Sequence, residues 1–285
     1  MSTSQIYFKY DGNSLSLKNH EIDAKVLADT LSNFADLIYE ANTIVNGIDS
    51  SVSVKAKAGF VEGSFGVELI IDQGIAGGVK DLLPILGLAA SAATGSLLSV
   101  LKNMKGKPAI DIEINESEDN VHINIGEEKV QASPEVAELA TNPSIRSKID
   151  QIIYKPLDID GTSSFQLFTD PEGDLLVDIS EDQRAIYKKP PISKPSYVSS
   201  SDTVATIEFI NANKESGNSG WKMIHLGKEV SVKIEDEVFL TLIKKPDAPS
   251  IFGHKFKVDL NLVTKKRISR PESKKYTIKK VRSKV

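Results

Sequence analysis

One uncharged stretch limits what this chain can fold into more than any other feature. Leu82 to Leu101 contains twenty residues and no charge, which is the length of a helix that crosses the hydrocarbon core of a bilayer. Gly87, Ser91, Gly95 and Ser99 repeat within it at every fourth residue, the spacing of small side chains that lets membrane helices approach closely. The stretch is therefore expected to be buried in the protein, in an oligomer or in a membrane.

Three interpretations of this segment are open. Pro84, two glycines and four hydroxyl residues lower its apolar character and predict a break near 93–96, so a buried or self-associating helical hairpin over 77–104, with Leu82 and Leu86 as contact residues, is the first. Conditional membrane entry of that hairpin is the second. A permanent single span is the third, but it would carry residues 1–81 across the membrane without an export signal.

The first 72 residues predict a ββαββ unit. Alternation over Gln5–Tyr10, the dipeptide Asp11-Gly12 and renewed alternation over Ser14–Leu17 predict a β-hairpin. Apolar residues at helical spacing predict one long amphipathic helix from Glu21 to Gly47. Two further strands are expected over 51–58 and 61–72.

A looser copy of this order follows. Strands are expected over 109–115 and 120–126, and helices at Ser133-Pro134 and Asn142-Pro143, where an N-cap residue precedes proline. Strands over 163–169 and 174–179 come next. Residues 188–203 are rich in Pro, Ser and Lys and predict a linker, so we expect an N-terminal α+β domain over 1–187.

The remaining residues, 204–285, predict a small barrel-like domain. A helix is expected over 236–244, and five short strands are expected over 204–210, 221–226, 230–234, 255–263 and 275–281. An oligonucleotide-binding-type barrel and an SH3-like barrel both fit this order. The fold class is therefore α+β with two domains.

Positive charge is concentrated at the C-terminal end. Residues 254–285 contain twelve Lys or Arg against Asp259 and Glu272, a net charge of +10, so the other residues carry −14 of the total of −4. Such asymmetry indicates contact with a polyanion or with the acidic part of the chain itself. The candidate contacts are Lys255, Lys257, Lys265, Lys266, Arg267, Arg270, Lys274, Lys275 and Lys279.

Catalytic motifs are missing from the sequence. The chain has no cysteine, which excludes thiolate nucleophiles and disulfides, and no P-loop, dinucleotide fingerprint or zinc-protease helix occurs. Four histidines stand apart in the sequence, and a calcium loop counted from Asp158 fails at Ser163 and Thr169. We therefore expect a protein that is not an enzyme and has no cofactor or metal.

The chain resembles a group of uncharacterised bacterial proteins. The residues that carry this resemblance are Ile6-Tyr7-Phe8 with Asp11-Gly12, the helix around 27–42, Glu62-Gly63-Ser64-Phe65, the apolar segment and the end over 276–281. The resemblance covers most of the chain and implies no established activity or site.

Three functions follow from these features. The first is a cytoplasmic, non-enzymatic binding or assembly protein, in which 82–101 is an internal or oligomer contact and the basic domain binds a protein partner. The alternative is a membrane-active effector that inserts the 77–104 hairpin. The third is nucleic-acid binding by the basic C-terminal domain, which predicts affinity that falls steeply with salt.

Overall fold

A computed structural model describes residues 2–19, 21–57, 65–74, 79–89, 95–115, 119–191, 195–267 and 270–285. Two units pack separately, and each has its own core. The N-terminal unit contains Met1–Ile112 and Asn120–Pro195, and the barrel unit contains Glu113–Asp119 and Ser196–Val285. The chain is a mixed α+β protein with a closed five-stranded barrel in its C-terminal region, as the sequence predicts.

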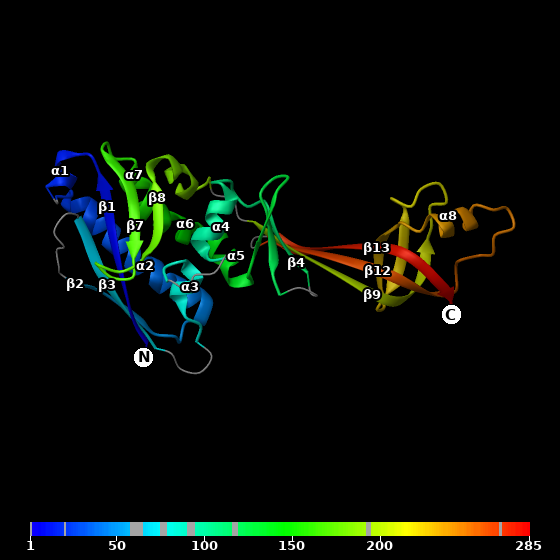
Figure 1. Cartoon of the computed structure of the whole chain (residues 1–285). Helices are drawn as coiled ribbons and strands as arrows, with labels where there is room; N and C mark the ends of the chain where they lie inside the picture. The colour runs from blue at the N-terminus through cyan, green and yellow to red at the C-terminus, as the bar shows by residue number, and fades with distance from the viewer. Residues whose placement is uncertain are drawn as a thin grey trace. The chain divides into compact units, whose positions relative to one another are not determined.

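The N-terminal unit combines a sheet with a group of helices (Figure 1). Its elements are β1 (Ser2–Gly12), α1 (Leu15–Lys18), α2 (Ala24–Asn46), β2 (Val52–Lys57), β3 (Phe65–Gln73), α3 (Leu82–Leu86), α4 (Leu97–Met104), β4 (Asp111–Asn115), β5 (Val121–Asn124), β6 (Lys129–Ala132), α5 (Pro134–Thr141), α6 (Pro143–Ile149), the π-helix η1 (Asp150–Tyr154), α7 (Lys155–Leu157), β7 (Thr162–Phe168), β8 (Leu175–Ser180) and the 3-10 helix η2 (Glu181–Tyr187). Strand β4 continues into the barrel unit at Glu113.

The long helix α2 covers one face of the antiparallel sheet, whose order is β2-β3-β1-β7-β8. Asp23 caps its first turn and Gly47, with a φ of 85°, ends it, so the predicted amphipathic helix is confirmed. The Phe8 ring on β1 stacks on Phe34 of α2 at 4.9 Å between centroids. The apolar stripe read from the sequence is therefore the surface that joins helix and sheet.

The predicted N-terminal hairpin is wrong. Residues Leu15–Lys18 form α1, and Ser14 caps it by accepting a hydrogen bond from the Leu17 N–H at 3.3 Å. Strand β1 pairs with β3 and β7, which come from much later in the sequence. A Cβ on Gly12 would lie 1.9 Å from the Gly161 carbonyl oxygen, so this glycine permits a close approach of two chain segments and not a hairpin turn.

The helices predicted at Ser133 and Asn142 are confirmed as α5 and α6, each with the expected capping side chain. The second helix was expected to reach Ile153, and it continues through η1 and ends with α7 at Leu157. Strands β7 and β8 match their predicted ranges closely. The two ββα-like portions lie in different sheets, and β6 and η2 fall where no element was expected.

The uncharged segment forms two short helices, α3 and α4, and residues 90–94, which include Ser91, lie outside the described residues. Eight of its apolar side chains, and Met104 just after it, are buried in the N-terminal unit: Leu82, Leu83, Leu86, Leu88, Leu97, Leu98, Val100 and Leu101 are the eight. Within the described ranges, none of the helices combines the length and apolar character that crossing a membrane requires.

The barrel unit contains the five strands and the helix expected near 236–244. They are β9 (Ser196–Asn211), β10 (Trp221–His225), β11 (Lys228–Ile234), α8 (Glu237–Ile243), β12 (Lys255–Arg267) and β13 (Arg270–Lys284). The strand order β9-β10-β11-β13-β12 closes through pairing of β12 with β9, and β11 runs parallel to β13. This order, with a helix between the third and fourth strands, is that of an oligonucleotide-binding-type barrel.

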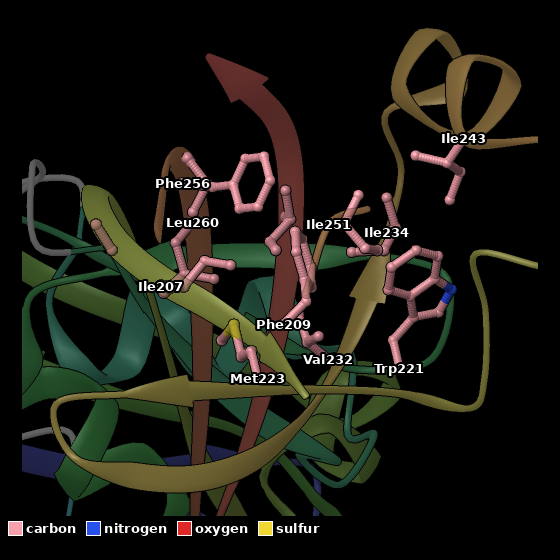
Figure 2. Close-up of a cluster of buried hydrophobic side chains, with 13 residues drawn as sticks. Ile207, Phe209, Trp221, Met223, Val232, Ile234, Ile243, Ile251, Phe256 and Leu260 are labelled. Atoms are coloured by element: carbon pink, nitrogen blue, oxygen red, sulfur yellow. The ribbon is translucent and has the colours of Figure 1, made fainter. Parts of the chain in front are cut away.

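The barrel is closed around a hydrophobic core that contains aromatic and aliphatic side chains (Figure 2). Phe209 contacts Trp221 edge to face at 5.4 Å and Phe256 at 5.4 Å between ring centroids. Met223, Val258 and Ile278 are among the core side chains, and none of these three is exposed. Trp221 is therefore a core residue of the barrel.

The predicted linker over 188–203 is only partly irregular, because β9 begins at Ser196. The start of this segment is fastened to the N-terminal unit. Asp150 accepts a hydrogen bond from the Lys189 N–H at 2.7 Å, the Arg146 guanidinium donates to the Lys188 carbonyl at 3.3 Å, and the Lys188 ammonium lies over the Tyr154 ring. Arg146, Asp150 and Tyr154 stand at every fourth residue, so their side chains share one helix face.

Candidate anion-binding surface

A hollow of about 400 Å³ opens at the edge of the barrel, where the end of β9 and the loop before β10 meet β10, β11 and β13. Its cationic lining residues are Lys222, Lys233, Lys274 and Lys275. Asn211, Asn218, Ser219 and Ser231 add amide and hydroxyl groups. Of the residues that the structure describes, those lining the hollow include no carboxylate. The lining of the hollow is therefore positively charged.

Strand pairing produces this hollow. The parallel ladder between β11 and β13 joins Val232–Ile234 to Tyr276–Ile278. Lys274 and Lys275 come before the paired stretch of β13 and therefore lie at the rim. On the neighbouring ladder Lys222 stands opposite Ser231, so these two side chains share the outer face while Trp221 and Val232 point into the core.

Two of the lysines form ion pairs with glutamates that do not line the hollow. Lys222 pairs with Glu229 at 2.7 Å, and Lys233 pairs with Glu235 at 2.9 Å. The hydrogen bond from Lys233 is the main cause that lowers the pKa of Glu235, and the charges of Lys233, Lys279 and Lys275 add to it. Exposed pairs of this kind are weak and are screened by salt, so a bound anion can replace the carboxylates.

The predicted cationic residues are only partly gathered here. Lys274 and Lys275 line the hollow, and Lys279 lies close enough to act on Glu235. Lys255 and Lys257 stand opposite Glu208 and Thr206 on the β12–β9 ladder, and they do not line the hollow. Lys265, Lys266, Arg267 and Arg270 lie at the β12–β13 hairpin, where the side chains of the two arginines fall outside the described residues.

Lys222 and Lys233 were missed by the sequence analysis. They belong to β10 and β11, far in sequence from the basic run at the C-terminal end. The available signal was their polar position in two strands that alternate polar and apolar residues, Trp221–His225 and Lys228–Ile234. Only the pairing of β11 with β13 brings them beside Lys275.

The small residues of the uncharged segment do not form one helix face. Gly87 ends α3 with a φ of 87°, Gly95 precedes α4 with a φ of 117°, and Ser99 lies within α4. A Cβ on Gly87 would lie 2.8 Å from the Ser96 hydroxyl oxygen. For these residues, the geometry of the turns explains why a small residue occurs at every fourth position better than close packing of helices does.

Asp158, from which the calcium loop was counted, and Asp170 further along the chain make ordinary local contacts. Asp158 pairs with Arg184 at 3.2 Å, and Asp170 accepts a hydrogen bond from the Glu172 N–H in its own turn. Within the described part of the chain, His, Asp and Glu side chains form no group of three or more that could hold a metal ion.

Comparisons of this chain with family models, with curated proteins and with solved structures find no match.

Proposed function

We propose that this protein acts by binding and that its barrel binds single-stranded nucleic acid through the phosphates. The observation that carries the proposal is the lysine-lined hollow on β10, β11 and β13. In oligonucleotide-binding-type barrels the second and third strands and the adjoining loops form the usual binding face. Here β10 and β11 are the second and third strands, and the loop before β10 contributes Asn218 and Ser219 to the hollow.

The ligand should be recognised mainly by its charge. Single-strand binding proteins usually add exposed aromatic rings on which bases stack. Trp221 is 1% exposed and donates its ring N–H to the Ser216 carbonyl, so it is not available for stacking. Tyr276 is the aromatic side chain of the hollow that is partly exposed. We therefore expect binding that is tolerant of sequence and strongly dependent on salt.

Binding of labelled oligothymidylate to the full chain, measured by fluorescence anisotropy, tests this proposal. If four lysines neutralise phosphates, raising the salt from about 50 to about 200 mM should weaken binding roughly fifty-fold. The triple change Lys222→Gln, Lys233→Gln, Lys275→Gln should flatten that dependence. Lys255→Gln with Lys257→Gln, which changes cations of another barrel face, serves as the control. Salt-independent binding, or equal losses in both variants, would contradict the proposal.

Self-association through 82–101 gains less support from the geometry. Leu82 and Leu86 are 0% and 1% exposed within their own unit, so they offer no surface to a second copy. Membrane insertion of the hairpin would release nine buried apolar side chains. Lipid would cover these side chains again, but the apolar side chains that they leave behind in the N-terminal unit would face water, so insertion would destabilise that unit.

A further inference from the structure

The β10–β11 hairpin has an unusual residue at its tip. His225 and Lys228 close the ladder, and Leu226 and Gly227 form the two-residue turn with φ of 50° and 74°. Two positive φ values identify a type I′ turn, in which Asn, Asp or Gly is strongly preferred at the first position. A leucine there is strained, because its Cβ crowds the backbone in the left-handed region.

The strain at Leu226 is not relieved by packing. Its side chain is 87% exposed, so the residue adds nothing to the core that would compensate for its backbone conformation. Lys105 is the other non-glycine residue with positive φ among those described, and it ends helix α4, where that conformation is common. Strained residues that bring no stability are typical of functional positions.

The position of Leu226 connects it with the lysine-lined hollow. Lys222 and Ile224 are two residues apart and both lie on the outer face of β10, where Ile224 is 38% exposed. Leu226 follows at the tip, four residues beyond Lys222, which is roughly 13 Å along a strand. Toward the tip the face becomes apolar and acidic, because Glu229 and Glu208 stand opposite Ile224 on the neighbouring strands. This end of the face therefore suits an uncharged base and not a phosphate.

We propose that Leu226, supported by Ile224, packs against an unpaired base of the strand whose phosphates occupy the hollow. The inference rests on the proposed function and assigns a base contact to a surface that otherwise recognises phosphate. Apolar side chains are known to pack on or between bases where they leave the regular stack. The charge of the adjoining hollow is what selects a nucleic acid over an apolar protein partner.

The test compares two ligands of equal backbone charge, an oligothymidylate and an abasic oligodeoxynucleotide of the same length, on wild type and Leu226→Asn. Asparagine suits the turn, so the variant should melt no lower than wild type. Its affinity for oligothymidylate should fall about five-fold, which is the lower end of the range for a base stacked on an aromatic side chain. Its affinity for the abasic ligand should not change.

Ile48→Asn, a change at an 86% exposed residue of the N-terminal unit, is the matched control and should leave both affinities unchanged. If wild type binds and Leu226→Asn binds each ligand as tightly as wild type does, the base contact is overturned and the phosphate surface stands. Equal losses on both ligands would also overturn it, because the leucine would then act without reading bases. Absence of binding by wild type would overturn the proposed function as well.

Discussion

At the scale of single residues, a polar group buried in the core depends on its hydrogen-bond partners within the protein. The Tyr10 hydroxyl lies in the core of the N-terminal unit, donates to the Ile152 carbonyl at 2.6 Å and contacts the Thr30 hydroxyl at 3.3 Å. Burial raises the pKa of Tyr10 above its ordinary value of 10.0, and the hydrogen bond with Thr30 opposes that shift in part. The folded state therefore keeps a proton that the unfolded state loses in alkali.

Tyr10→Phe should reveal this linkage. At pH 8 the change should cost about 1 to 3 kcal/mol, because the Ile152 carbonyl loses its buried donor. Above pH 10 the unfolded wild-type chain releases the Tyr10 proton, so wild-type stability should fall by about 1.4 kcal/mol per pH unit relative to the variant. Urea unfolding of both proteins at pH 8 and pH 11, followed by far-UV circular dichroism, measures the difference. A constant difference across this range would contradict the buried hydroxyl.

Local signals explain which residues could be placed from sequence. Ser133 and Asn142 cap the helices that were expected to start there, since capping depends on neighbours a few residues away. Ser14 also caps a helix, but the sequence around it fits a hairpin equally well. The pairing of β1 with the distant strands β3 and β7 decides between the two structures. Lys222 and Lys233 belong to the candidate site because of strand pairing at long range, which no local pattern contains.

At the scale of elements, the uncharged segment shows how one pattern fits two structures. Twenty residues without charge satisfy the length of a membrane helix, yet the chain turns at Gly87 and begins α4 only at Leu97. Asp81 caps α3 by accepting from the Leu83 N–H at 3.2 Å. Caps and left-handed glycines are thus the information that separates two short core helices from one long helix.

Leu86→Lys should unfold the N-terminal unit without affecting the barrel. Leu86 is 1% exposed, and an ammonium group buried there has no partner, so the helical transition should move down by roughly 10 °C or more. The neighbouring half-exposed Ile85 provides the control, because Ile85→Lys can keep its charge in water. Thermal scans at 222 nm report this unit.

A different result would restore the membrane interpretation. It would require wild-type protein that resists carbonate washing from membranes, and a Leu86→Lys variant that loses this association while its thermal transition is unchanged.

At the scale of the whole molecule, each unit carries its own core and its own reporter. The chain contains one tryptophan, Trp221, which is buried in the barrel core. Most helices belong to the N-terminal unit, including the long α2. Tryptophan fluorescence therefore follows the barrel, while the far-UV signal of helices follows the N-terminal unit.

A ligand of the barrel should stabilise the two signals unequally. Oligothymidylate at about one hundred times its dissociation constant should stabilise the folded barrel by about 2.7 kcal/mol, and so raise the fluorescence transition of Trp221. The helical transition at 222 nm should stay where it is, because the phosphates contact only barrel residues. Equal shifts of both transitions would show that the ligand also binds the N-terminal unit.

Closed and open strand arrangements make different parts of this chain unequal risks for aggregation. The five barrel strands pair in a ring, which leaves few of their backbone groups to recruit another chain, whereas the first sheet ends at β2 and β8 and the other sheet ends at β6. Strand β2 carries Lys55 and Lys57, paired with Asp72 at 3.1 Å and Glu68 at 3.0 Å. These lysines act as gatekeepers of an open edge, so chemical acylation of them should promote fibrous association that begins from the N-terminal unit.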